Sequence, residues 1–174
     1  MKKHIALVGF MAAGKSTIGK KLARKLKVSF FDTDDLVVLE HGAVSDIFYN
    51  EGEKAFRNYE HAAVAHVLED GEPGIVALGG GALTHEPTQK LLKKLAYRVF
   101  IKVSPEQVVE RLRKSKRVRP LLGPTPSLSK IKELYTKRMQ QYAHADFVVE
   151  ADGMSTSQIV DAIVVWLHKK KIEI

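Results

Sequence analysis

The spacing of hydrophobic residues changes several times along this chain, and each change predicts the end of one element and the start of another. Short runs made almost entirely of apolar residues are typical of strands that are buried on both faces. Each run is followed by glycine, by acidic residues or by a helical pattern, so none is long enough to be a buried helix. We expect strands at residues 5–8, 28–31, 75–78, 99–103 and 147–149.

Between these runs the apolar residues recur every three or four positions, which is the spacing of one helix face. Ile18, Leu22 and Leu26 predict a helix that begins near Lys15. Pro105 follows Ser104, the order of an N-cap and a first helical residue. Further helices are expected around 36–39, 56–67 and 91–95, from Ser127 or Ser129 toward Tyr142, and at 159–167.

Strands that alternate with helices predict a parallel sheet covered on both faces, which is an α/β fold. The chain has 174 residues, of which 45% are hydrophobic, a size and composition that suit one domain. In such a sheet, ligands bind beyond the carboxyl ends of the strands. The polar residues that directly follow strands are therefore the candidates for chemistry.

Composition excludes several classes of protein and draws attention to one segment. The chain has no cysteine, hence no disulfide framework and no thiolate metal site. No apolar run approaches the roughly 20 residues that span a bilayer, and lysines follow the first apolar run where an exported protein would have a cleavage site, so we expect a cytoplasmic protein. The formal net charge is +8, and the excess lies within residues 98–138, which hold 12 Lys and Arg against 3 Asp and Glu. Such a segment attracts polyanions, either nucleic acid or the phosphates of a nucleotide.

The strongest chemical signal is GFMAAGKST, which follows the first strand at residues 9–17. It fits the P-loop pattern G-x-x-x-x-G-K-[ST], and it stands between a predicted strand and a predicted helix, as that pattern requires. Backbone N–H groups of such a loop surround phosphates, Lys15 is expected to reach the β- and γ-phosphates, and the Ser16 hydroxyl to ligate Mg²⁺. The residues that we expect to contact ATP here are Ala12, Ala13, Gly14, Lys15, Ser16 and Thr17.

Two further groups of residues follow predicted strands. Asp32 and Asp34 follow the second strand, and alternation along it predicts that both carboxylates face one cleft beside the P-loop, whereas Asp35 points away. An aspartate in this place is also a common helix cap. One carboxylate would hold metal-bound water while the other takes the proton of a hydroxyl nucleophile. Glycines at 79–81 follow the third strand, and backbone without Cβ lets a small ligand lie against the main chain.

In combination these motifs resemble those of the shikimate kinases over essentially the full chain. The blocks GFMAAGKST, FFDTDDL, IFYNEGEKAFRNYE, VALGGGAL, RPLL and KRMQQY stand in that family's order and spacing. Ala12 departs from the family pattern, which usually has glycine there, although the P-loop pattern stays intact. The segment after Arg119 varies within the family and predicts little.

The resemblance implies a three-layer P-loop kinase fold of the α/β class, in which a five-stranded parallel sheet of order 2-3-1-4-5 carries helices on both faces and a lid. It implies one domain over residues 1–174, with a substrate-binding helical region at about 33–62 and a lid at about 112–127. The implied reaction transfers the γ-phosphoryl group of ATP, with Mg²⁺, to the 3-hydroxyl of shikimate, which gives shikimate 3-phosphate and ADP.

The resemblance also gives roles to residues by their position. Lys15 stabilises the transferring phosphoryl group, Ser16 binds Mg²⁺ and Asp32 assists through water. Asp34 is the implied general base, and Arg119 on the lid meets the phosphates, where an arginine that arrives on closure would neutralise developing charge. The residues implied to bind shikimate are Asp34, Arg57, Gly79, Gly80, Gly81 and Arg138.

Residue chemistry agrees with this part of the assignment. Guanidinium groups match a planar carboxylate in a way that lysine does not. Glu60 stands three residues after Arg57, where it can fix the orientation of that arginine on a helix. Phe48 and Phe56 are expected in the core, and the resemblance places one or both against the substrate ring.

Other functions share some of these motifs. A gluconate kinase or a nucleotide kinase would have the same P-loop and sheet, but fits the DTD and GGG blocks and the paired arginines less well. A non-catalytic module could use the loop to bind nucleotide, or the basic segment to bind nucleic acid. We expect ATP and shikimate as ligands, no nucleic acid or membrane partner, and a monomer. Arg111 or Arg113 is expected to contact adenine, and the sequence does not choose between them.

Overall fold

Five parallel strands form the sheet of this computed structural model, which describes residues 2–115, 121–122 and 127–174. The strand order is β2-β3-β1-β4-β5, and every neighbouring pair is parallel, which confirms the expected topology. The strands are β1 (His4–Val8), β2 (Phe30–Asp32), β3 (Ile75–Ala77), β4 (Ala96–Lys102) and β5 (Phe147–Glu150).

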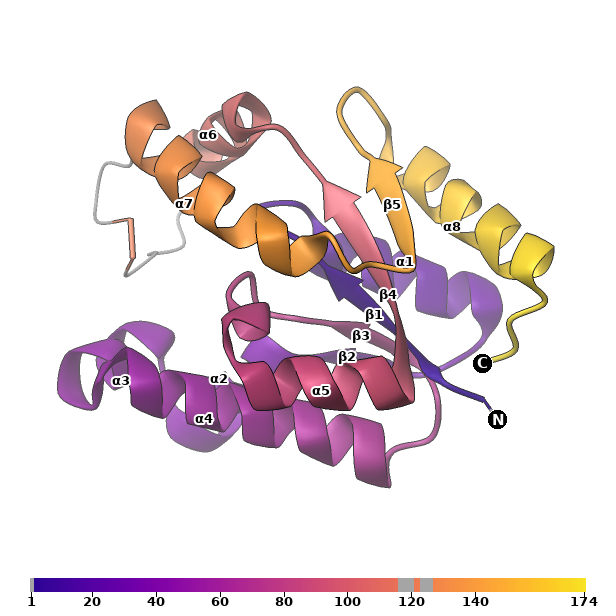
Figure 1. Ribbon diagram of the computed structural model, residues 1–174, viewed down its shortest axis with the longest axis horizontal. Helices are drawn as coiled ribbons and strands as arrows, with labels where there is room; N and C mark the ends of the chain where they lie inside the picture. The colour runs from indigo at the N-terminus through magenta and orange to yellow at the C-terminus, as the bar shows by residue number, and fades with distance from the viewer. Residues whose placement is uncertain (1, 116–120, 123–126) are drawn as a thin grey trace.

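Helices cover both faces of this sheet (Figure 1). On one face α1 packs against α8, and on the other α4 packs against α5, while α6 and α7 contact each other beyond the arrowheads of β1 and β4. The α-helices are α1 (Lys15–Leu26), α2 (Thr33–His41), α3 (Val44–Asn50), α4 (Gly52–Ala65), α5 (Glu86–Leu95), α6 (Pro105–Lys114), α7 (Leu128–Tyr142) and α8 (Thr156–Lys170). A π-helical turn, η1 (His66–Asp70), extends α4, and a 3₁₀ turn, η2 (Ala82–Thr84), precedes α5.

The central strand β1 shows why a continuous apolar run marks a buried parallel strand. Successive side chains point to opposite faces of a sheet, and both faces of β1 are covered. Ile5 and Leu7 belong to the core cluster shared with α1 and α8, whereas Ala6 and Val8 belong to the cluster beneath α5 and η1. All four residues are buried, so a polar residue on either face would be taken out of water.

Local signals in the sequence set several element ends. Ser104 caps α6 by accepting a hydrogen bond from the Gln107 N–H, and Ser127, rather than Ser129, caps α7. The second strand begins later than expected, at Phe30, because α1 ends in a left-handed residue, Lys27 (φ 57°). The Val28 N–H then donates back to the Ala23 carbonyl, so this residue still belongs to the helix end.

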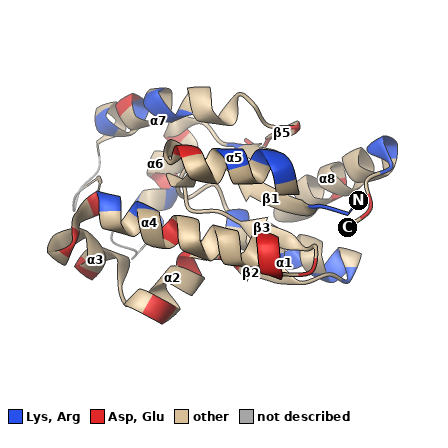
Figure 2. Cartoon of the chain, turned by 60° about the horizontal axis from the view of Figure 1, so that its bottom comes forward, with Lys and Arg blue, Asp and Glu red and all other residues tan. Residues whose placement is uncertain are grey.

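Charged residues are unevenly distributed over the surface. Figure 2 shows Asp and Glu on α2 and α3, and Lys and Arg on α7 at the opposite side of the same end of the molecule. Within residues 2–115, 121–122 and 127–174, no helix has the length and apolar character needed to cross a membrane.

Candidate active site

The P-loop connects β1 to α1, where its backbone turns sharply enough to require left-handed residues. Gly14 is the N-cap of α1 and has a φ of 91°, a conformation that glycine adopts without steric cost. Lys15, the first residue of α1, is 9% exposed, and its Nζ donates to the carbonyls of Gly9 (2.8 Å) and Phe10 (3.0 Å). The ammonium group therefore lies against the loop that precedes it, where a phosphate would meet both the cation and the helix N-terminus.

Ser16 and Asp32 are brought together beside this loop. The Ser16 hydroxyl donates to Asp32 Oδ2, and Asp32 Oδ1 caps α2 by accepting from the N–H groups of Asp34 (3.1 Å) and Asp35 (3.4 Å). Strand alternation does not relate Asp34 to Asp32, contrary to the prediction, because the strand ends at Asp32 and α2 begins at Thr33. The expectation that Asp35 points away is also wrong, since within this helical turn Asp34 and Asp35 both line the adjacent cavity.

That cavity has a volume of about 470 Å³ and lies between the P-loop, the third strand's glycines and helices α2, α3, α4 and α7. Met11 of the P-loop lines it, and its backbone nitrogen lies 3.0 Å from the point where a Cβ on Gly80 would stand. The two loops are thus in contact, and the cavity opens beside the P-loop. All six residues implied to bind substrate line it: Asp34, Arg57, Gly79, Gly80, Gly81 and Arg138.

Arg57 is held in this cavity by two carboxylates of its own helix. Its Nη1 donates to Glu60 Oε2 at 2.7 Å and its Nη2 to Glu53 Oε1 at 3.2 Å. A Cβ on Gly81 would collide with Arg57 Nη2, so this glycine leaves the space that the guanidinium group occupies. The predicted contact with Glu60 is confirmed, whereas Glu53 was missed although it stands four residues before Arg57 on the same helix face.

Glu60 is itself an unusual group, because its side chain is 2% exposed. Burial raises the pKa of Glu60 to about 7, an effect that Arg57 opposes and Asp34 reinforces. Its second oxygen, Oε1, has no hydrogen-bond partner among the described residues. A Cβ on Gly79 would collide with that oxygen and would lie 2.7 Å from Asp34 Oδ1. Glu60 and Asp34 therefore both approach the glycine loop, and a residue without a Cβ is needed at position 79 to leave them space.

Arg138 enters the cavity from the last third of α7. It is 4% exposed, and its guanidinium carbon lies 5.5 Å from the centre of the Phe10 ring, in a cation–π arrangement. One turn later, the Tyr142 hydroxyl donates to the Gly80 carbonyl at 2.6 Å. Burial raises the pKa of Tyr142, which keeps this hydroxyl protonated as a donor. Tyr142 was missed as a site residue, although it stands four residues after Arg138 in the block KRMQQY.

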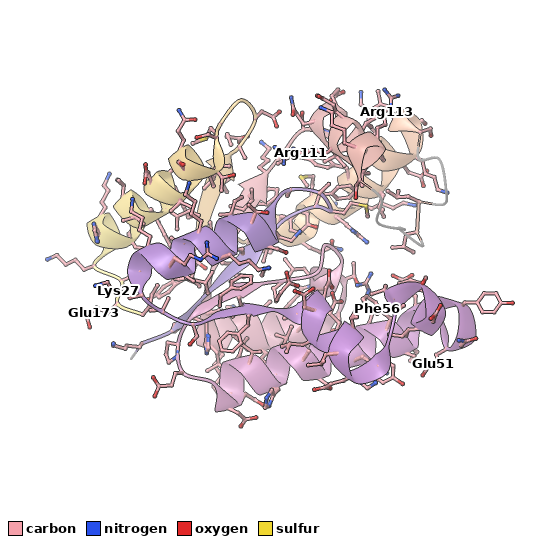
Figure 3. The ribbon with its side chains drawn as sticks, turned by 180° about the vertical axis from the view of Figure 1, so that it is seen from behind. Lys27, Glu51, Phe56, Arg111, Arg113 and Glu173 are labelled. Atoms are coloured by element: carbon pink, nitrogen blue, oxygen red, sulfur yellow. The ribbon has the colours of Figure 1, made fainter. Side chains whose placement is uncertain are left out.

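Two aromatic rings form the apolar side of the cavity. The centroids of Phe48 and Phe56 lie 4.9 Å apart, and both residues line the space beside Arg57. Figure 3 labels Phe56 at the same end of the molecule as Glu51, the residue that precedes α4. The cavity thus has one apolar side and one cationic side, which suits a small ring that carries a carboxylate.

The remaining predicted positions lie around the P-loop or outside the described residues. Thr17 follows Ser16 in the first turn of α1. Arg111 contacts the P-loop backbone, whereas Arg113 is exposed. Arg119 lies outside the described residues, as does most of the lid expected at about 112–127. Leu121, which is described, lines the cavity.

A magnesium site must be judged from its oxygen ligands. Groups of three or more His, Cys, Asp and Glu that could hold a metal are absent from the part of the chain that the structure describes. Mg²⁺ prefers oxygen and commonly takes only one or two protein ligands, with water and phosphate oxygens completing its shell. The Ser16 hydroxyl and the Asp32 carboxylate, which touch each other at the P-loop, fit that requirement.

Comparisons with known proteins identify the family of this chain. A family model described as shikimate kinase matches residues 11–168. A shikimate kinase from Francisella tularensis subsp. novicida is 37% identical over 172 residues, which cover 98% of this chain and 97% of that protein.

Solved structures give the same result. A shikimate kinase from Acinetobacter baumannii in complex with shikimate superposes with a TM-score of 0.91 at 30% identity and covers 99% of this chain and 97% of its own. A shikimate kinase from Bacteroides thetaiotaomicron has a TM-score of 0.88 at 30% identity, over 95% of this chain and 98% of its own.

Proposed function

Because this chain belongs to the shikimate kinase family, we propose that it is the ATP-dependent enzyme that phosphorylates the 3-hydroxyl of shikimate. The products are shikimate 3-phosphate and ADP. One observation carries the proposal: the buried guanidinium groups of Arg57 and Arg138 line the same cavity as Asp34, directly beside a P-loop. This arrangement supports an anion site, a general base and a phosphate site around a space of about 470 Å³.

Arg57 and Arg138 bind the shikimate carboxylate in this proposal. The Nε atoms of both arginines are buried without a hydrogen-bond partner among the described residues, so each has unused capacity for an acceptor. A guanidinium group binds a carboxylate through two parallel N–H groups. The glycines at 79–81 bring backbone close to the bound ring, and Phe48 and Phe56 pack against its apolar face.

Asp34 acts on the reacting hydroxyl. It lines the cavity beside the P-loop, where it accepts a hydrogen bond from the 3-hydroxyl and takes up its proton as the oxygen attacks phosphorus. The neighbouring Glu60 is the second carboxyl group there. Because burial favours its neutral form, it adds less negative charge beside Asp34 than an exposed glutamate would.

The P-loop holds the phosphates. Backbone N–H groups at residues 12–17 and the Lys15 ammonium group contact them, and Lys15 exchanges the carbonyls of Gly9 and Phe10 for phosphate oxygens. Ser16 and Asp32 hold Mg²⁺, the latter through water; when bound, this ion neutralises charge on the phosphate oxygens. Arg119 meets the phosphates from the lid.

The domain organisation and partners belong to the same proposal. The chain forms one domain, residues 33–62 carry most of the substrate side, and residues 112–127 form the lid. Helices α2, α3 and α4, which line the cavity, support the assignment of the substrate region. The basic segment at 98–138 serves the polyphosphate of ATP rather than nucleic acid, and the enzyme works in the cytoplasm as a monomer with no membrane partner.

A coupled assay of ADP release tests this function. Shikimate with ATP and Mg²⁺ is expected to give turnover, whereas gluconate and nucleoside monophosphates at the same concentrations give none above the ATPase background. Lys15→Met serves as the matched blank, because it removes the phosphate-binding ammonium group and keeps most of the side-chain volume. Turnover with gluconate or a nucleotide and none with shikimate would replace the proposed substrate.

A further inference from the structure

Arg111 on α6 contacts the P-loop from outside the site. Its Nη1 donates to the carbonyls of Ala12 (3.0 Å) and Ala13 (3.2 Å), which lie almost 100 residues earlier in the chain. In Figure 3 Arg111 lies on the side of α6 toward that loop, and Arg113 lies farther out. Arg111 is half-buried and Arg113 is exposed. Of the two arginines near the end of α6, Arg111 is therefore the one that contacts the P-loop.

The residue that Arg111 contacts has a conformation that is unfavourable for its type. Ala12 has a φ of 59°, in the left-handed region. Elsewhere in the described part of the chain, positive φ at a residue other than glycine is found at Lys27 and Lys171, and both are C-caps of helices. Ala12 has no such helix end to explain it. For an alanine this conformation costs roughly 1–2 kcal/mol, and for glycine almost nothing.

The direction of the contact matters for phosphate binding. In a planar trans peptide the C=O and the N–H point in opposite directions. Since the carbonyls of Ala12 and Ala13 point toward Arg111, the N–H groups of Ala13 and Gly14 point away from α6. The Ala13 N–H faces the interior of the loop, where it donates to the Phe10 carbonyl at 3.2 Å. Arg111 thus fixes the direction of two successive peptides, and their N–H groups face the side of the loop opposite to α6.

We propose that Arg111 is a positioning residue for the P-loop, which holds Ala12 in its left-handed conformation and thereby orients the N–H groups that bind phosphate. The inference rests on the proposed function, since it takes this loop as the ATP phosphate site. It assigns Arg111 a role through the backbone of Ala12 and Ala13, and this role differs from a contact with the adenine base.

A ligand without adenine separates the two roles. Isothermal titration calorimetry is run with magnesium tripolyphosphate and with MgADP on the wild type and on Arg111→Met. Without the hydrogen bonds from Arg111, the Kd of both ligands is expected to rise by a similar factor, about tenfold, which corresponds to roughly 1.4 kcal/mol of loop strain. Lys90→Met is the control, because it removes a positive charge from an exposed side chain that is paired with Glu86 on α5, outside the lid and the basic segment. It changes either Kd by less than about twofold, as expected for a surface ion pair.

Ala12→Gly tests the mechanism itself. Glycine adopts positive and negative φ about equally, so the P-loop of this variant keeps its shape without help from α6. In the Ala12→Gly background, Arg111→Met is expected to raise the Kd for tripolyphosphate by less than about threefold. This rescue also shows that the loss in the single variant is not a general loss of folding, which thermal melting of each variant checks independently.

Three results would overturn the inference. A loss for MgADP with no loss for tripolyphosphate would show that Arg111 binds the base. Equal losses with alanine and with glycine at position 12 would show that Arg111 acts as a charge and does not hold the loop. Failure of the wild type to bind either ligand would instead reject the P-loop as a phosphate site, and with it the proposed function, before any variant is compared.

Discussion

Arg57 and Glu60 form an ion pair inside the cavity, with Nη1 and Oε2 2.7 Å apart and both side chains at least nine-tenths buried. The pair stands one helical turn apart on α4, so the sequence spacing i, i+3 alone brings the two groups together. The burial of Glu60 depends on tertiary structure, because the glycine loop packs against Glu60 and Asp34 together. A buried ion pair of this kind orients a binding group, and its contribution to stability depends on the charge state of the acid.

The charge state of Glu60 predicts a pH-dependent stability. The folded pKa is about 7 and the reference pKa is 4.5, so between these values the folded chain binds more protons than the unfolded chain. The free energy of unfolding therefore gains a contribution from Glu60 at acid pH, which is lost as the pH rises from about 4.5 to about 7. Each unit of pKa difference corresponds to about 1.4 kcal/mol.

Urea denaturation of the wild type and Glu60→Gln from pH 4.5 to 8 measures this contribution. The wild type is expected to lose stability relative to the variant across that range, because glutamine has no proton to release. Glu53→Gln is the control, since it also contacts Arg57 but its side chain is 48% exposed. A constant difference between wild type and Glu60→Gln at all pH values would show that Glu60 has the same pKa in the folded and the unfolded chain.

A methyl group at position 81 is expected to displace Arg57. In Gly81→Ala the new Cβ would stand 2.6 Å from Arg57 Cζ, far inside van der Waals contact, so the guanidinium group must move away from the glycine loop. We expect the KM for shikimate to rise about tenfold or more, which corresponds to about 1.4 kcal/mol or more of binding free energy. The KM for ATP should change little.

Gly153→Ala is the matched control for that variant. A Cβ at position 153 meets no atom within 4 Å, but the φ of Gly153 is 74°, so alanine there costs roughly 1 kcal/mol of stability. This control loses stability without a change in either KM. If Gly81→Ala behaves in the same way, with a lower melting temperature and an unchanged KM for shikimate, then Arg57 does not bind the substrate.

Asp34→Asn is expected to separate chemistry from nucleotide binding. The amide keeps the size of the carboxylate but is not a base, so kcat should fall by roughly 10²- to 10⁴-fold. The Kd for MgADP should stay within about threefold, since ADP lacks the group that the nucleophile attacks. Asp35→Asn removes a neighbouring charge that lines the same cavity and should lower kcat by far less. Equal losses in the two variants would mean that Asp34 acts through the local charge rather than as a base.

Much of the fold could be predicted because its signals are local. The runs at 5–8 and 75–78 are apolar throughout, and the Ser104-Pro105 cap and the P-loop glycine are determined by backbone geometry within a few residues. The start of β2 was predicted two residues early, because Val28 is apolar whether it ends a helix or begins a strand. The left-handed conformation of Lys27 decides between a helix end and a strand start, and lysine as a residue type does not predict that conformation.

The site could be predicted only in part for a related reason. Arg57 and Glu60 share one helix, so their contact follows from spacing. The hydrogen bond from Tyr142 to Gly80 joins residues 62 apart, and that from Arg111 to Ala12 joins residues 99 apart. Such contacts depend on where α6 and α7 lie relative to the P-loop and the glycine loop, which periodicity does not specify.

Arg138 offers a test in which the substrate and the protein are varied together. Its guanidinium group is buried over the Phe10 ring, and its Nε lacks a partner among the described residues. Arg138→Lys keeps the charge but cannot form two parallel hydrogen bonds to a carboxylate. The KM for shikimate should therefore rise by about tenfold to hundredfold, for a loss of roughly 1–3 kcal/mol, while kcat changes less.

The methyl ester of shikimate completes the cycle, since it has no carboxylate for Arg138 to bind. With the wild type, the ester should have a higher KM than shikimate. With Arg138→Lys, the same change of substrate should matter much less, because the interaction it removes is already weakened. If the ester raises KM by the same factor in both enzymes, the carboxylate is bound by other groups and Arg138 has a different task in the cavity.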